Sequence, residues 1–343
     1  GPYVGHGMAC AGIIAASHSR DTLASLMTSS GIVSLNPIVK VLPVKIYDDI
    51  GLAVDNPKIA EAVTYAYTSG ADILSNSWSW DDPDFELPVL TEALTRAVLF
   101  GRDGRGCSVV QSSGNTRKYY PDPSYVRYPA WLSTSLAVGA SRLDDTRWYY
   151  SGYGPELDFI APSDDGYTVG VWTLDQMNDL GVNPWDEFDC PFGSNDQSYR
   201  CHFGGTSAAA PVVAGVASLL LSKDSTLGVQ AIYYILRNSA VTALDWGTIS
   251  PPDTQYGYGR VDAFRAVLSI SRGDVTNNGA IDLPDVIFLG NYLFQGGPAP
   301  FPSPLLGDVN CDGQVDLADV NYLTSALFLS GPPIVSPCFE FGD

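Results

Sequence analysis

Short apolar runs and longer amphipathic segments alternate along the first half of the chain. The apolar runs predict β-strands within 32–46 and at 72–79, 107–111, 135–140 and 157–162. Apolar residues at helical spacing predict helices directly after His6, at 58–69 and at about 87–100. Because strands alternate with helices, we expect an α/β fold with helices on both faces of a parallel sheet.

The most apolar segment, 208–221, predicts a helix buried in a globular protein, because fourteen residues are too few to cross a bilayer. A small, glycine-rich turn, Phe203-Gly204-Gly205-Thr206-Ser207, precedes it. A hydroxyl at this place lies among unpaired N–H groups at the positive end of the helix dipole, which favours developing negative charge. Ser207 is therefore a candidate nucleophile, with a helix N-cap as the alternative.

Two further polar residues occupy places where parallel sheets carry functional groups, and a histidine begins a predicted helix. Ser79 and Asn115 follow predicted strands, and such groups gather on the loops at the carboxyl ends of strands. His6 stands between glycines at the start of a predicted helix, either as a functional side chain or as a capping or core histidine. The chain has only 3 histidines, so histidine-dependent chemistry has few candidates.

Composition narrows the classes of function. A chain of 343 residues can form one large or two modest domains. The net charge of −20 argues against nucleic-acid binding, since phosphates would be repelled, and it suits a secreted protein that binds cations. We find no signal peptide and no membrane span, which is expected of a mature, trimmed or partial chain.

The chain changes character after Arg272, where a loop followed by an apolar segment occurs twice with a period of 34 residues. Each loop has oxygen-bearing side chains at positions 1, 3, 5, 9 and 12 and glycine at position 6. This is the spacing of EF-hand calcium loops, with a solvated acidic turn as the alternative, and we expect two Ca²⁺ ions. The predicted ligands are Asp274, Thr276, Asn278, the carbonyl of Ala280, Asp282 and Asp285, then Asp308, Asn310, Asp312, the carbonyl of Gln314, Asp316 and Asp319.

Five blocks of sequence, in the same order as in the family, resemble subtilisin-like serine proteases. They are His6-Gly-Met-Ala-Cys-Ala-Gly, Asn76-Ser-Trp-Ser, Ser113-Gly-Asn115, Tyr150-Ser-Gly-Tyr-Gly-Pro-Glu-Leu-Asp and Gly205-Thr-Ser207-Ala-Ala-Ala-Pro-Val-Val-Ala-Gly. The resemblance implies a peptidase domain over residues 1–270, with a three-layer fold around a parallel sheet.

The resemblance also implies a role for each matching residue. Ser207 would be the nucleophile, His6 the general base, and Asn115 would bind the oxyanion together with the backbone N–H of Ser207. An extended peptide substrate would lie between two short segments that pair with it and wall its pocket. These segments are Ser77, Trp78 and Ser79, and Ser112, Ser113 and Gly114.

The family's catalytic aspartate precedes the histidine on a central strand, and none of the five residues before His6 is acidic. We keep three explanations: an aspartate upstream in the same gene, a cleaved N-terminal fragment that stays docked, or a degenerate relative kept as a scaffold. The expected function is a secreted serine endopeptidase whose aspartate lies upstream. The alternative is an inactive scaffold in an extracellular complex.

Residues 273–343 resemble dockerin modules, because both loops have aspartate at position 12 and no helix precedes either loop. This implies a small all-α module whose partner is cohesin-like or belongs to the same chain. We expect disulfides between Cys190 and Cys201 and between Cys311 and Cys338, as in an oxidising, extracellular setting.

The other two cysteines are expected to stay reduced. Cys10 resembles the free cysteine of proteinase-K-like members of the family, and Cys107 is expected to be a buried thiol. Of the remaining histidines, His202 is interpreted as a loop residue at the rim of the site.

Overall fold

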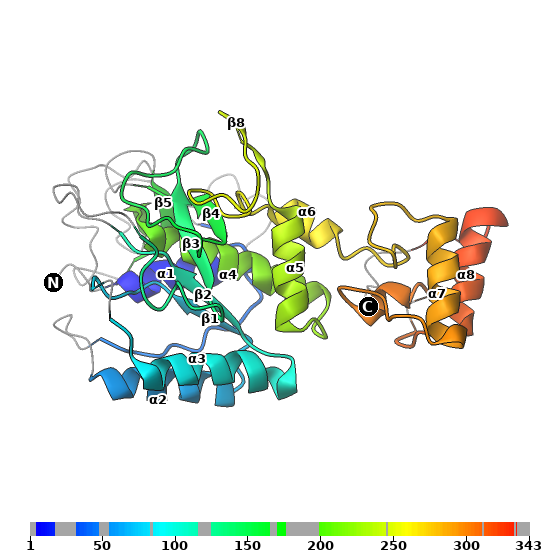
Figure 1. Ribbon diagram of the computed structural model, residues 1–343, viewed down its shortest axis with the longest axis horizontal. Helices are drawn as coiled ribbons and strands as arrows, with labels where there is room; N and C mark the ends of the chain where they lie inside the picture. Colours follow the sequence, from blue (N-terminus) through cyan, green and yellow to red (C-terminus); the bar gives the residue numbers. More distant parts are fainter. Residues whose placement is uncertain are drawn as a thin grey trace. The chain divides into compact units, whose positions relative to one another are not determined.

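The computed structural model describes residues 5–17, 32–47, 55–82, 85–115, 125–164, 170–175, 199–244, 246–310, 312–332 and 334 (Figure 1). The chain divides into two compact units. The first comprises Gly1–Leu219 and Ala240–Asp262, and the second comprises Leu220–Ser239 and Ala263–Asp343. The predicted domain limits at 270 and 273 stay a prediction.

The first unit contains a four-stranded parallel sheet in the order β1-β2-β3-β4. Its strands are β1 (Ile73–Asn76), β2 (Ser108–Ser112), β3 (Leu136–Ser141) and β4 (Phe159–Pro162). β2 and β3 are buried along their whole length, as expected of parallel strands covered on both faces. The prediction of an α/β fold with a parallel sheet is confirmed.

Helices α2 (Asn56–Thr68) and α3 (Pro88–Phe100) lie side by side along this sheet (Figure 1). Each begins with a proline in its first turn, where the missing N–H has no helical acceptor to lose. Leu90 and Leu94 of α3 are fully buried in one core with Val109 of β2. This packing holds β2, and with it the loop that carries Asn115.

The prediction of strands within 32–46 is wrong. The described residues 32–47 contain no strand, and the backbone N–H groups of Leu35 and Asn36 donate to the carbonyls of Ile13 and Ile14 (both 3.0 Å). Asn36 also donates through its side chain to Ser218 Oγ (3.1 Å). Near its start, the segment thus forms backbone hydrogen bonds with the end of a helix.

Helix α1 (His6–Ala15) packs against the antiparallel pair β5 (Val171–Leu174) and β6 (Tyr199–Phe203). The approach is close, because a Cβ on Gly12 would lie 2.4 Å from Thr173 Oγ1. Ala9 and Ile13 of α1 share a small core with Phe203 and Ala208. The start of α1 is thereby held beside the end of β6.

Helix α4 (Thr206–Lys223) has 18 residues, longer than the sequence pattern predicts. It is long and apolar enough to cross a membrane by length and composition alone. However, 67% of that window is buried inside the protein, as in the core helix of a globular domain. The first unit is completed by η2 (Arg102–Gly104), β7 (Ala243–Leu244) and β8 (Gly247–Thr248).

The described elements of the second unit are helical. They are the last turn of α4, then α5 (Val229–Ser239), α6 (Ala263–Leu268), α7 (Leu283–Gln295), η5 (Pro304–Gly307) and α8 (Leu317–Phe328). Both repeat loops lead into a helix through a capping box, Asp282 with Asp285 before α7 and Asp316 with Asp319 before α8. One 3₁₀ turn, η5, directly precedes the second loop.

Candidate active site

Ser207 is the second residue of α4, at the junction where β6 passes into the helix. Two glycines form this junction. Gly205 has a φ of +75°, a conformation that favours glycine, and a Cβ on Gly204 would lie 2.2 Å from the carbonyl oxygen of Asp164. The turn is therefore pressed against residue 164, which places the Ser207 side chain at the N-terminus of a buried helix.

Asn115 lies beyond the carboxyl end of β2, and its side chain reaches this junction. Its Oδ1 atom accepts hydrogen bonds from the backbone N–H of Thr206 (2.9 Å) and from Thr206 Oγ1 (3.0 Å). Since the carbonyl end of the amide is held in this way, its NH₂ end is oriented away from Thr206. A Cβ on Gly205 would come within 3.2 Å of that Nδ2 atom, so glycine leaves the amide its space.

Cys10 connects His6 with Ser207. Its Sγ atom lies 3.9 Å from His6 Nδ1 and donates to the carbonyl of Ser207 at 3.6 Å. The His6 ring meets Phe203 edge-on, with centroids 5.5 Å apart. The structure thus brings together the three residues predicted to be catalytic: Asn115 contacts the residue before Ser207, and Cys10 contacts both His6 and Ser207.

The electrostatic surroundings favour neutral side chains here. Burial, followed by the positive charge of Arg200, lowers the pKa of His6 below its usual value. A neutral imidazole can accept a proton, as a general base must. Burial also raises the pKa of Cys10 to about 11, so this thiol is protonated at neutral pH and acts as a weak donor.

The first predicted substrate segment touches Ser207. Ser77 Oγ donates to the carbonyl of Ser207 (2.9 Å), and Ser207 Oγ lies 3.5 Å from the carbonyl oxygen of Ser77. The carbonyl of Trp78 accepts from the side chain of Gln111, and the Trp78 ring packs edge-on against Trp80. Ser77, Trp78 and Ser79 are half-buried beside the site.

The second predicted segment is more deeply buried. The side chains of Ser112 and Ser113 are buried. The backbone N–H of Ser113 donates to the carbonyl of Val138 (2.9 Å), and its carbonyl accepts from the N–H of Arg127 (3.0 Å). The N–H of Ser113 is therefore already used within the protein, and pairing of this segment with a substrate stays a prediction. At Gly114 φ is +98°, and a Cβ would clash with Arg127. A role for this segment in walling a pocket stays a prediction.

His202 is not a loop residue, contrary to the prediction. It lies in β6, with 14% of its side chain exposed, and its Nδ1 atom is 3.7 Å from Oδ2 of the fully buried Asp164. Strand β6 was not predicted, because the sequence between residues 163 and 202 is polar and rich in turn residues.

Only part of the cysteine prediction can be followed in the structure. Cys10 and Cys107 carry free thiols, as predicted. The two expected disulfides involve Cys190, Cys311 and Cys338, which lie outside the described residues. These pairings stay predictions.

Sequence analysis overlooked three residues that shape the site. Thr206 holds the amide of Asn115, and the carbonyl of Asp164 accepts from the N–H of Gly205 (2.9 Å). Arg200 is the charged group that affects His6. The Gly-Gly-Thr sequence before the serine could have indicated Thr206, whereas Asp164 and Arg200 carry no local signal.

The repeat loops of the second unit each bury two carboxylates. Those at loop positions 1 and 12 are between 0% and 6% exposed: Asp274, Asp285, Asp308 and Asp319. The other predicted ligands are half-buried or exposed around them: Thr276, Asn278, Ala280, Asp282, Asn310, Asp312, Gln314 and Asp316. Buried carboxylates of like charge are costly unless they are neutralised.

In the second loop, backbone N–H groups orient both buried carboxylates. Asp308 accepts from the N–H groups of Asp312 (3.1 Å) and Gly313 (3.2 Å), and Asp319 accepts from those of Val309 (2.9 Å) and Asn310 (3.2 Å). Burial raises the pKa of Asp319, and the neighbouring charge of Asp308 acts in the same direction. A bound cation would relieve this repulsion.

The donor set fits Ca²⁺, which prefers oxygen ligands. Among the residues that the structure describes, no three His, Cys, Asp or Glu side chains gather closely enough to hold a metal ion. A calcium ion in either loop would therefore also need other oxygens. The first loop offers amide, hydroxyl and backbone oxygens, and the second offers amide and backbone oxygens.

Comparison with known sequences places the chain among proteases. The profile of the Subtilase family matches residues 2–259. A calcium-dependent protease of Trichormus variabilis is 30% identical over 281 residues, which cover 76% of this chain and 39% of the relative. Thermitase of Thermoactinomyces vulgaris is 29% identical over 263 residues, covering 77% of this chain and 75% of the relative. The chain thus spans about two-fifths of the length of the calcium-dependent protease.

Solved structures agree on the fold. A serine protease of Aeromonas sobria superposes with a TM-score of 0.62 at 18% identity, over 77% of this chain and 53% of that one. A lanthipeptide protease superposes with a TM-score of 0.52 at 24% identity, over 76% and 74%. Since the family profile covers most of the sequence, the chain belongs to the subtilase family of serine proteases.

Proposed function

We propose that this chain is the main part of a secreted serine endopeptidase. Ser207 Oγ attacks the carbonyl carbon of a peptide bond while His6 takes the hydroxyl proton, which gives a tetrahedral intermediate with a negative oxygen. The NH₂ group of Asn115 and the backbone N–H of Ser207 donate to that oxygen. His6 then returns the proton to the leaving amine, and water hydrolyses the acyl-enzyme.

The observation that carries this proposal is the orientation of Asn115. Thr206 donates twice to its carbonyl oxygen, so its amide hydrogens are free to serve as donors beside the N-terminus of α4. Glycine at position 205 leaves the NH₂ end of this amide its space. Fixed donors stabilise charge well because they do not have to reorient during the reaction.

The aspartate that completes such a triad would come from a segment upstream of Gly1. It would orient His6 and stabilise the imidazolium form. Its negative charge would also oppose the effect of Arg200 on the histidine. In the subtilisin family, loss of this acid alone lowers kcat by about 3 × 10⁴, so the acid is decisive for activity.

The test is the intact mass of protein from its natural source, before and after treatment with a fluorophosphonate probe. We expect one adduct, which peptide mapping places on Ser207 and which Ser207→Ala abolishes. Asn115→Ala should slow labelling by about 10²–10³, the magnitude known for the oxyanion asparagine of subtilisin. A native sample that lacks an adduct and contains no residues before Gly1 would overturn the proposal.

A catalytically inactive scaffold is the second candidate. Arg200 favours it, because this cation adds to burial in opposing the protonation of His6 that the reaction requires. A scaffold would show no adduct even with its complete N-terminal region, whereas an endopeptidase would. The same experiment therefore separates the two functions.

For residues 273–343 we propose a dockerin-like module that binds two Ca²⁺ ions, with ligands from the two loops identified above. The buried carboxylates at positions 1 and 12 support this proposal, as does the calcium-dependent protease among the relatives. Without the cation these carboxylates repel one another, so EDTA should loosen residues 273–332 first. Unchanged resistance of this segment to an added protease in EDTA would contradict the proposal.

A further inference from the structure

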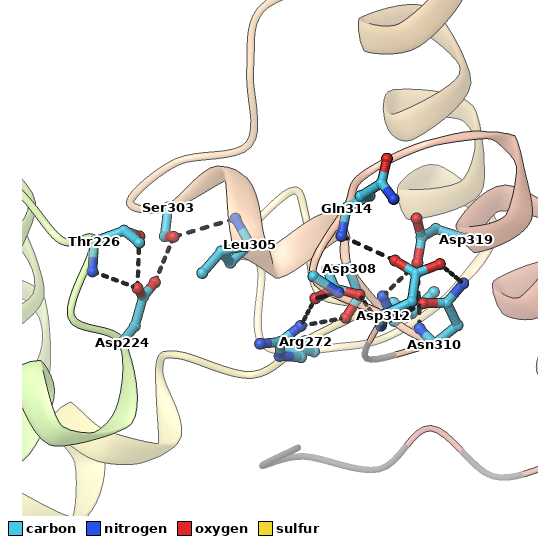
Figure 2. Close-up of polar contacts among 12 residues, drawn as sticks. Asp224, Thr226, Arg272, Ser303, Leu305, Asp308, Asn310, Asp312, Gln314 and Asp319 are labelled. Carbon is cyan, nitrogen blue, oxygen red and sulfur yellow. Dashed lines mark hydrogen bonds and ion pairs between the residues drawn. The ribbon is translucent and has the colours of Figure 1, made fainter. Parts of the chain in front are cut away.

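The turn that follows α4 is linked to the segment between the two repeats (Figure 2). Asp224, directly after α4, is 6% exposed, and its Oδ1 atom accepts from the N–H (2.9 Å) and Oγ1 (2.6 Å) of Thr226. Its Oδ2 atom accepts from Oγ of Ser303, which is 1% exposed. A buried carboxylate needs each of these donors, so the Asp224–Ser303 contact is a specific link between segments 79 residues apart.

Ser303 leads directly into the second calcium loop. Its Oγ atom accepts from the N–H of Leu305 (3.2 Å) and so caps η5, which ends at Gly307. Asp308, the first predicted ligand of the second loop, is the next residue. The position of this ligand is therefore tied to Asp224 through one 3₁₀ turn.

A second set of contacts leads from the end of α4 to Asp308. Lys223 Nζ donates to the carbonyl of Val267 in α6 (2.8 Å). Arg272, a few residues further on, donates through Nη1 to the carbonyl (2.6 Å) and to the carboxylate of Asp308. Figure 2 shows Arg272 beside Asp308, which is 1% exposed.

An aromatic pair extends the interface to α5. The rings of Tyr234 and Phe301 meet edge-on with their centroids 4.6 Å apart. A polar contact and an apolar contact thus join residues 301–303 to the α4–α5 turn and to α5. All the residues that form these contacts belong to the second unit. Part of this unit, residues 220–239, lies within the stretch that the family profile matches, and the repeats lie outside it.

We propose that the second calcium loop and the segment 301–307 form a calcium-dependent clamp on the α4–α5 turn (residues 224–228) and on α5. The inference rests on the calcium binding proposed above and names the partner of the repeats as a surface of this same chain. Binding of Ca²⁺ fixes Asp308, and through Arg272 and η5 it orders the groups that hold Asp224 and Tyr234. A ligand that binds only the folded loop stabilises every segment that unfolds together with it.

The experiment is amide hydrogen exchange on the whole chain, read by mass spectrometry, in 1 mM CaCl₂ and in EDTA, with MgCl₂ as the ion control. We expect calcium to slow exchange in residues 229–239 by about fivefold or more, which is the lower end of coupling between linked sites. Ser303→Ala should abolish most of this effect on α5 while calcium still protects α8.

Ser269→Ala is the matched control, because its hydroxyl donates only locally, to the carbonyl of Ala266 (2.8 Å). It should leave the effect of calcium on α5 unchanged. Protection of α7 and α8 without any change in 229–239 of the unmodified chain would overturn the clamp while leaving calcium binding intact. Absence of calcium protection everywhere would overturn the proposed calcium binding, and the clamp with it.

Discussion

Gly204→Ala tests the packing of the nucleophile turn with the smallest possible side chain. The new Cβ would lie 2.2 Å from the carbonyl oxygen of Asp164, a backbone atom that cannot rotate away. Ordinary contact requires about 3.4 Å, so the turn must move by about 1.2 Å. The hydrogen bond from the Gly205 N–H to that carbonyl (2.9 Å) would then be lost or strained.

The expected cost is about 1.5–4.5 kcal/mol in the free energy of unfolding of the first unit, and we expect a loss near the middle of this range. About 1–3 kcal/mol comes from overpacking and about 0.5–1.5 kcal/mol from the lost hydrogen bond. For a unit of this size, the melting temperature should fall by about 3–18 °C. Tryptophan fluorescence is a suitable probe, because all 7 tryptophans lie in the residue ranges of the first unit.

Gly7→Ala provides the control for this substitution. Gly7 lies in α1, and a Cβ there would have nothing within 4 Å. Alanine is favoured over glycine in helices by up to about 1 kcal/mol, so the unit should not be destabilised. Equal melting temperatures for Gly204→Ala and the unmodified protein would refute the inferred tight contact between the turn and residue 164.

Three further predictions concern the site. Thr206→Val removes one of the two donors to the Asn115 amide, and we expect fluorophosphonate labelling to slow by about 2- to 10-fold while the melting temperature changes little. The Cys10 thiol, with a pKa of about 11, should resist iodoacetamide at pH 8 in the folded protein and react fully in urea; fast reaction of the folded protein would contradict its burial. Because Arg200 lowers the pKa of His6, Arg200→Gln should move the acid limb of labelling to higher pH. An unchanged acid limb of labelling in Arg200→Gln would disprove the role of that cation. The lowered pKa of His6 also affects stability. As the pH falls through 6.5, the unfolded chain binds the proton first, so the free energy of unfolding decreases.

The elements could be predicted well where the signal is local. The strands β1 to β4 and the helices α1 to α4 were predicted, because apolar periodicity follows from the geometry of each element alone. The region 32–46 was mispredicted as strand for the same reason. An apolar pattern does not say which partner will take the backbone hydrogen bonds, and here the end of α1 takes two of them.

The residues proposed to contact a substrate or an ion were accessible from the sequence, whereas those that support them were not. Ser207 lies in a recognisable turn before a helix, and the calcium spacing in both loops lies within twelve residues. His202 and Asp164 meet only because β6 is placed beside the end of β4.

By itself, the sequence determined the strands β1 to β4, the helices α1 to α4, the family, the glycine-rich turn before Ser207 and the spacing of the repeat, because each depends on residues close together along the chain. Only the tertiary structure decided that Thr206 holds Asn115, 91 residues away, and that Ser303 meets Asp224, 79 residues away. Such pairs form when separate elements pack, and packing depends on the shape of the whole core and not on any local pattern.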